Sequence, residues 1–172
     1  MEVLWAPWRG TYVRGPKREE CFLCQFPQDP PERDAATYVV HRGATGYILL
    51  NLFPYSNGHL MVAPYAHVAS PEELSPEALL ELMQLTNLGL RALRQVSAPH
   101  GFNVGMNLGT AAGAGLAEHL HLHVVPRWQG DVNFMPVVGD TRVIPDALDQ
   151  TWARLRQAIA EVQGPTPEPG EA

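Results

Sequence analysis

Cysteine, positive charge and long apolar runs are all scarce in this sequence of 172 residues. No apolar run reaches the about 18 residues that suggest a membrane-spanning helix, so no membrane contact is expected. Lys and Arg number 12 against 18 Asp and Glu, which gives a net charge of −6. This balance argues against a partner nucleic acid held by bulk electrostatic attraction, but it leaves small anionic ligands open.

The first five residues also lack the basic segment and apolar core of a signal peptide, so a cytoplasmic protein is expected. The length favours a single domain, which we expect over residues 1–163 with residues 1–20 as an irregular N-terminal arm. Residues 164–172 are rich in Pro and Gly and are expected to form a disordered tail.

The only cysteines, Cys21 and Cys24, form a C-x-x-C pair at the start of an expected loop over residues 21–34. In a cytoplasmic chain this spacing indicates metal or redox chemistry rather than a structural disulfide. A thioredoxin-type site needs a helix after the pair, and the prolines that follow disfavour a regular helix. The pair therefore favours metal binding.

Alternating apolar residues and turn residues predict an α+β domain with a mainly antiparallel sheet. Strands are expected over residues 37–41, 47–52, 59–64 and 102–108, with weaker candidates over residues 134–138 and 141–144. A long helix is expected over residues 76–95, and a final helix from Pro145. The core-facing stripe of the long helix is predicted to be Leu79, Leu82, Met83, Thr86, Leu90 and Leu93, and that of the final helix Leu148, Trp152, Leu155 and Ile159.

Three histidines recur at every second position within residues 118–127, at His119, His121 and His123. Side chains alternate along a strand, so a strand here would place all three imidazoles on one face and Leu120 and Leu122 on the other. Such a row supports two chemistries. The three rings can ligate a catalytic metal ion, or one ring can attack an electrophile while its neighbours fix its tautomer.

A loop of small residues over positions 109–115 runs directly into this histidine segment. Backbone N–H groups in glycine-rich loops can approach phosphate oxygens closely. A glycine-rich loop is a weak signal alone, but next to a nucleophile it favours attack at phosphorus.

The segment His119-Leu120-His121-Leu122-His123-Val124-Val125 resembles the signature of the histidine-triad (HIT) superfamily of nucleotide hydrolases and transferases. The similarity extends over most of the chain and is greatest to diadenosine tetraphosphate phosphorylases and hydrolases of that superfamily. It implies a HIT-like fold with a long helix and a C-terminal helix. It also implies a homodimer with the long helix near the subunit contact.

The resemblance also implies roles for individual residues. His121 would be the nucleophile that takes the nucleotidyl group, His123 would lie beside the α-phosphate, and His119 would complete the triad. Asn51 matches the position that holds the ribose, and His59 one that supports the triad. Relatives often carry a side-chain donor where this chain has residues 115–117, so the remaining phosphate contacts fall on Asn107, Thr110, Gly113, Gly115 and Leu116.

Some relatives hold a structural zinc ion with two cysteines and two histidines. The matching residues are Cys21, Cys24, His67 and His119, and no organic cofactor is implied. Two buried, reduced cysteines and a surface His67 remain the alternative. His41 and His100 match no site position, so structural or surface roles are expected for them.

The expected function is therefore cleavage of dinucleoside polyphosphates through a nucleotidyl-histidine, with inorganic phosphate rather than water as the favoured acceptor. A phosphorylase of this kind gives ADP and ATP from diadenosine tetraphosphate. Hydrolysis of the same substrates or of nucleoside phosphoramidates is one alternative. A metallo-enzyme that uses the three histidines as ligands and a non-catalytic nucleotide-binding protein are the others.

Overall fold

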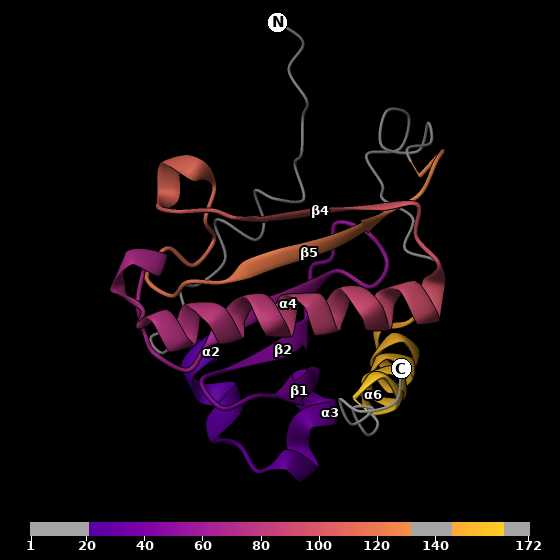
Figure 1. Cartoon of the computed structure of the whole chain (residues 1–172), viewed down its shortest axis with the longest axis horizontal. Helices are drawn as coiled ribbons and strands as arrows, with labels where there is room; N and C mark the ends of the chain where they lie inside the picture. The colour runs from indigo at the N-terminus through magenta and orange to yellow at the C-terminus, as the bar shows by residue number, and fades with distance from the viewer. Residues whose placement is uncertain (1–20, 132–145, 164–172) are drawn as a thin grey trace, which may run out of the picture.

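Five strands form one antiparallel sheet in the order β1-β2-β3-β5-β4 in the computed structural model, which describes residues 21–131 and 146–163. The long helix α4 lies across one face of this sheet, and α6 packs against α4 and the β1 edge (Figure 1), which confirms the α+β prediction. The strands are β1 (Val39–Arg42), β2 (Gly46–Leu50), β3 (Leu60–Pro64), β4 (Gly101–Met106) and β5 (Leu122–Arg127), and the helices are α4 (Pro76–Ser97) and α6 (Leu148–Val162).

The opposite face of the sheet carries residues 21–37, which fold into single helical turns rather than the expected loop. These turns are α2 (Phe22–Gln25), η1 (Phe26–Gln28), η2 (Pro31–Arg33) and α3 (Asp34–Thr37). Pro27 is the second residue of η1 and Pro31 is the first of η2, positions in a first turn where the missing N–H costs no helical hydrogen bond. Leu23 anchors this layer in a second core cluster with Tyr47, Leu49 and Met61.

β2 and β3 are buried along their whole length, because layers cover both faces of the sheet at its centre. This explains why their sequences are continuously apolar rather than alternating. The hairpin between them turns at Gly58, whose φ of 75° lies in the left-handed region. A Cβ at this position would also lie 2.9 Å from a methyl carbon of Leu93 in α4, so both the turn and the packing require glycine.

α4 extends two residues beyond the expected end and buries a wider face than the predicted stripe. Leu82, Thr86 and Leu93 are buried as predicted, but Met83 is 46% exposed. The helix packs on α6 as well as on the sheet, so its buried face also includes Leu85, Leu88 and other residues outside the stripe. On α6, Leu155 and Ile159 are buried and Trp152 is partly buried, as predicted.

The histidine strand is shorter than the pattern predicted. It begins at Leu122 as β5 and leaves His119 and His121 before its first residue. β5 pairs with β3 from Leu60↔Val124 to Val62↔Leu122, and the ladder stops as it approaches Pro64, which has no N–H to donate. The N–H of Leu120 donates instead to the carbonyl of Val68, at 2.6 Å.

The other strand boundaries move by one or two residues. β1 begins at Val39 rather than at residue 37, β2 ends at Leu50 and leaves Leu52 exposed, and β4 ends at Met106. The strand candidates over residues 134–138 and 141–144, the N-terminal arm and the tail lie outside the described residues.

Arg42, at the end of β1, ties the layer of short turns to the sheet. Its guanidinium donates to the carboxylate of Asp34, at 2.7 and 3.0 Å, and to the carbonyls of Phe26, Pro27 and Asp29. The Asp34 side chain is 4% exposed, and it also accepts a hydrogen bond from Arg156 of α6 at 3.0 Å. One buried carboxylate therefore joins both layers.

Arg42→Ala is expected to lower the free energy of unfolding by roughly 2–4 kcal/mol, because it leaves a buried carboxylate short of a partner and three carbonyls without their donor. Urea denaturation measures this loss. The matched control is Arg33→Ala, because Arg33 pairs with Asp29 at 3.8 Å while its side chain is 63% exposed. That control should change stability by less than about 1 kcal/mol, and equal losses in the two variants would contradict the assignment.

Candidate functional site

The segment that leads into β5 places its histidines on the face of the sheet opposite α4. Leu120, Leu122 and Val124 belong to the core under α4, whereas His123 lies opposite Met61 of the second cluster. The predicted alternation of leucines and histidines is therefore confirmed. The rings themselves take different partners.

His119 lies among the residues predicted to bind metal. Its Nδ1 is 3.3 Å from Sγ of both Cys21 and Cys24, and Nδ1 of His67 is 3.2 Å from Sγ of Cys24. One ligand atom from each of the four residues falls within a cluster in which all atoms are within 4.8 Å of one another. The C-x-x-C pair is held compactly because the N–H of Cys24 donates to the carbonyl of Cys21.

The protonation state of this cluster suits a metal ion. Nε2 of His119 is 2.9 Å from the carbonyl oxygen of Pro64, which can only accept, so the proton lies on Nε2 and the Nδ1 lone pair faces the thiols. Burial lowers the pKa of His119, which keeps the ring neutral. Burial and the neighbouring Cys21 thiol raise the pKa of Cys24 to about 11. A divalent cation would reverse that shift and take both thiolates as ligands.

His121 is oriented by the backbone of His119. Its Nδ1 donates to the His119 carbonyl at 2.9 Å, which leaves the lone pair on Nε2. The side chain is 8% exposed, and burial lowers its pKa. A neutral imidazole with an in-plane lone pair is the form that attacks an electrophile.

His123 meets His59, as expected for a residue that supports the triad. Nε2 of His59 is 3.0 Å from Nδ1 of His123, and the ring centroids of His121 and His123 are 4.9 Å apart. Asn51 reaches the same group, since its Nδ2 is 3.4 Å from Nδ1 of His59. The sequence did not single out Tyr55, whose ring centroid is 4.7 Å from that of His59, because nothing in a turn sequence shows where its ring will lie.

The three rings do not share one metal position. His119 faces the cysteines, Nδ1 of His121 is taken up by a carbonyl, and Nδ1 of His123 faces His59. This arrangement disfavours the hypothesis of a metal ion bound by all three. The donors instead divide into an S₂N₂ cluster and a separate pair of rings.

The loop over residues 109–115 contains η4 (Thr110–Ala112) between two glycines with positive φ, Gly109 and Gly113. The N–H groups of residues 112–114 donate to carbonyls within this loop, so fewer donors are available than the composition suggested. Thr110, Gly113 and Gly115 are exposed, and Asn107 is half-buried. Met106 pairs with Leu122, so the next residue, Asn107, lies level with His121. Leu116 packs on the second core cluster.

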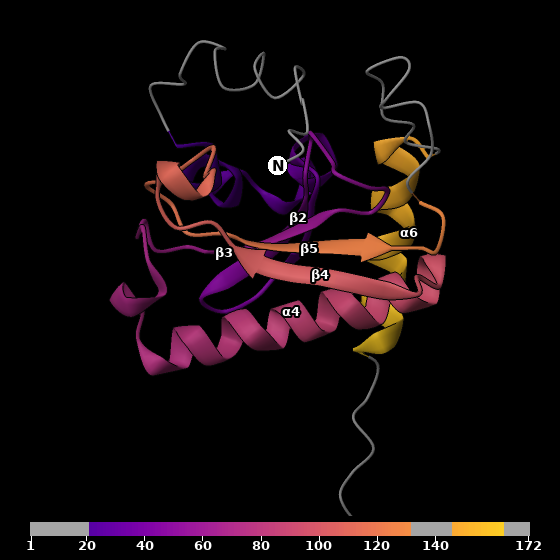
Figure 2. The ribbon, with the colours of Figure 1, turned by 90° about the horizontal axis from the view of Figure 1, so that it is seen from above.

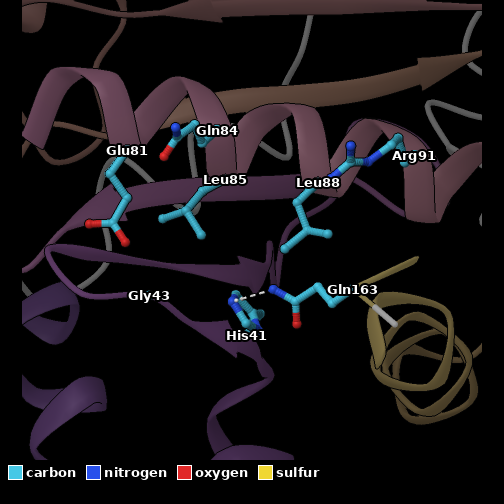
Figure 3. A pocket seen from close by; sticks show the side chains of 8 residues that line it. All are labelled: His41, Gly43, Glu81, Gln84, Leu85, Leu88, Arg91 and Gln163. Atoms are coloured by element: carbon cyan, nitrogen blue, oxygen red, sulfur yellow. Dashed lines mark hydrogen bonds between the residues drawn. The ribbon is translucent and has the colours of Figure 1, made fainter. Parts of the chain in front are cut away.

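A hollow of about 230 Å³ lies on the α4 side of the sheet, opposite the triad histidines (Figure 3). Nε2 of His41 lies 3.2 Å from the Gln163 amide there. The Glu81 carboxylate accepts from the N–H groups of Ala44 and Thr45, which fixes the β1–β2 turn to α4. The polar groups of the hollow thus connect elements of the fold, which agrees with the structural role expected for His41.

His100 is likewise structural, since its Nδ1 accepts from the N–H of Gln129 at 2.8 Å.

Among the described residues, no helix combines the length and apolar character needed to cross a membrane.

Comparisons with known proteins agree with this geometry. Residues 32–130 match the family model described as HIT domain. The chain is 45% identical over 167 residues to the AP-4-A phosphorylase of Mycobacterium tuberculosis, a match that covers 90% of this chain and 86% of the relative.

Two solved structures are similar in fold. A Zn-bound histidine triad family protein from Mycobacterium smegmatis is 27% identical with a TM-score of 0.66, over 83% of this chain and 95% of that one. A hypothetical histidine triad nucleotide-binding protein from Sulfolobus tokodaii is 24% identical with the same TM-score of 0.66, over 83% of this chain and 93% of that one.

The cluster of two cysteines and two histidines predicts one bound divalent transition-metal ion per chain. Cys24→Ser is expected to reduce the metal content at least about tenfold, because it removes a thiolate from a four-ligand site. Elemental analysis of the purified protein measures this content. The control is His123→Ala, which leaves the cluster intact and should keep the metal. Loss of metal in the control with both cysteines present would favour a site on the triad instead.

Proposed function

This chain belongs to the HIT domain family, and from that membership we propose that it cleaves diadenosine tetraphosphate with inorganic phosphate, giving ATP and ADP. The observation that carries the proposal is the 45% identity to an AP-4-A phosphorylase across 90% of the chain. The neutral His121, with its lone pair at Nε2, supplies a nucleophile that fits this chemistry.

The proposed reaction has two steps. In the first, Nε2 of His121 bonds to the α-phosphorus, the bond from that phosphorus to the bridging oxygen breaks, and ATP leaves. In the second, an oxygen of inorganic phosphate attacks the same phosphorus, the bond to Nε2 breaks, and ADP leaves with His121 restored. Two displacements through a covalent intermediate replace one direct attack between two anions.

The residues around His121 supply binding and charge stabilisation in this proposal. His123 and the backbone at Gly115 and Leu116 would donate to the equatorial oxygens of the α-phosphate as charge develops there. Asn51 would contact the ribose, and the side chains of Asn107 and Thr110 would receive the acceptor phosphate, with Gly113 leaving space for it in the loop. The loop carries no acidic side chain before Glu118, which favours the approach of a second anion.

We also propose that the ion held by Cys21, Cys24, His67 and His119 is zinc, in a structural role. Two thiolates and two imidazoles form a closed tetrahedral set with no open position for substrate. A similar structure is described as Zn-bound. The ring of His119 would be fixed by the ion while its carbonyl orients His121, so this site would support the nucleophile. Thiolate ligands also suit a reducing cytoplasm, which is the proposed location.

The acceptor is tested by assaying products from diadenosine tetraphosphate with and without inorganic phosphate. The expected products are ATP and ADP, with a rate that depends strongly on phosphate concentration. His121→Asn is the control, since it should abolish turnover while the folded protein still binds AMP. Equal rates with and without phosphate, giving AMP and ATP, would make the protein a hydrolase, and turnover above about a tenth of the wild-type rate in His121→Asn would contradict the nucleophile.

We also propose that two copies of the chain form a homodimer in which their β4 strands pair. Within the described sheet β4 is an edge strand, its Val104 is 44% exposed, and Leu80 and Met83 on the outer side of α4 are 61% and 46% exposed. Pairing of two β4 strands would satisfy both edges and cover these side chains. Sedimentation at micromolar concentration should show a dimer that Val104→Lys weakens at least about tenfold, whereas Ala160→Lys on α6 should not. A monomeric wild-type protein would rule this out.

A further inference from the structure

The hairpin loop between β2 and β3 directs two N–H groups at one nitrogen of His59. The backbone N–H of Tyr55 donates to Nδ1 of His59 at 3.1 Å, and Nδ2 of Asn51 is 3.4 Å from the same atom. The orientation of the Asn51 amide follows from its other end, because Oδ1 accepts from the N–H of Phe53 at 2.9 Å. The NH₂ group of Asn51, and not its oxygen, therefore faces His59.

These donors determine the tautomer of His59. An Nδ1 that accepts hydrogen bonds carries no proton, so the neutral ring carries its proton on Nε2. His59 is 0% exposed, which disfavours a charged ring and leaves no room for water to exchange partners. The proton on Nε2 faces Nδ1 of His123, 3.0 Å away.

His123 must then take a defined tautomer as well. Its Nδ1 accepts from His59, so the neutral ring carries its proton on Nε2, at the edge away from His59. His121 has the opposite form, because its Nδ1 donates to the His119 carbonyl. Two histidines whose centroids are 4.9 Å apart thus differ at Nε2, where one has a lone pair and the other an N–H.

We propose that Asn51 and the backbone N–H of Tyr55 are positioning groups that set the tautomer of His123 through His59. His123 then presents an N–H donor, rather than a lone pair, to the anionic oxygens of the phosphate that His121 attacks. This inference rests on the proposed function. It gives Asn51 a role in turnover beyond contact with the ribose.

A lone pair at Nε2 of His123 would repel the phosphate oxygens. The direction of the hydrogen bonds from Asn51 through His59 to His123, called the relay below, therefore determines whether His123 stabilises the transition state. Phosphoryl transfer concentrates charge on the equatorial oxygens, and each fixed donor aimed at them contributes to the rate. Aspartate has nearly the shape of asparagine, but it replaces the NH₂ donor with an anionic oxygen that only accepts. Exchange of one for the other therefore tests the direction of the relay with little change in shape.

The experiment measures the ¹⁵N chemical shifts of histidine-labelled, full-length protein without nucleotide, which distinguish protonated from unprotonated ring nitrogens. In the wild type, His59 and His123 should be protonated on Nε2 and His121 on Nδ1. Asn51→Asp places a carboxylate oxygen opposite Nδ1 of His59, and its negative charge outweighs the remaining donor, the N–H of Tyr55. The proton of His59 should therefore move to Nδ1, and His123 should change to the opposite tautomer.

Kinetics on diadenosine tetraphosphate separate this role from ribose binding. For Asn51→Asp, kcat should fall at least about tenfold while KM changes less than about threefold, since the lost interaction belongs to the transition state. The matched control is Asn103→Asp on β4, whose oxygen already accepts from Arg127 at 2.8 Å. That control should leave both the tautomers and kcat unchanged.

Three outcomes would overturn the inference. They are a wild-type His123 protonated on Nδ1, an Asn51→Asp variant in which His59 gains the proton but His123 is unchanged, and a rise in KM alone. If Asn51→Asp does not fold, His59→Phe provides the second test, because His123 should then populate both tautomers. The tautomers are measured without substrate, so they stand or fail independently of whether phosphate is the acceptor.

Discussion

The antiparallel pairing of β3 with β5 is the constraint on which the site depends. The register Met61↔His123 brings the end of β3 beside the histidine segment. It places His59, two residues before Met61, against His123, and Pro64 against His119. A shift of one residue would exchange the two faces of β5 and send the histidines into the core under α4. The leucines buried on that side therefore fix the positions of the imidazoles on the other.

Burial and directed hydrogen bonds give chemically identical side chains different properties in this site. Each of the three triad rings has one nitrogen committed to a fixed partner: a carbonyl for His119, a carbonyl for His121 and an imidazole for His123. In the proposed function the other nitrogen of each ring would serve as a metal ligand, a nucleophile or a donor. Because the two carbonyl-bound rings are nearly inaccessible to water, these assignments cannot be exchanged easily through solvent.

The layer of short turns has few apolar contacts of its own and depends on polar anchors. Figure 2 shows these turns, in indigo, on the side of the sheet away from α4. Leu23 is the one fully buried apolar side chain of this layer, and Arg42 and Asp34 connect the turns to the sheet and to α6. The cysteine-histidine cluster is the third anchor and lies on the histidine side of the sheet. This layer supports the ring of His119 and, through the His119 carbonyl, the ring of His121. Its stability and the geometry of the site are therefore linked.

The sequence by itself determined the α+β class and the separation of the triad histidines from the leucines, because side-chain alternation is a local property. Its resemblance to the HIT superfamily implied the four residues that the structure brings together as a possible metal site. The sequence overestimated the histidine strand, since the end of a ladder depends on the partner strand, here at Pro64. For Asn51 the resemblance implied only a contact with the ribose of the substrate. The hydrogen-bonded ring nitrogens, and hence the chemical form of each histidine, were decided by tertiary structure alone, because their partners come from distant segments or from backbone groups that only the fold orients.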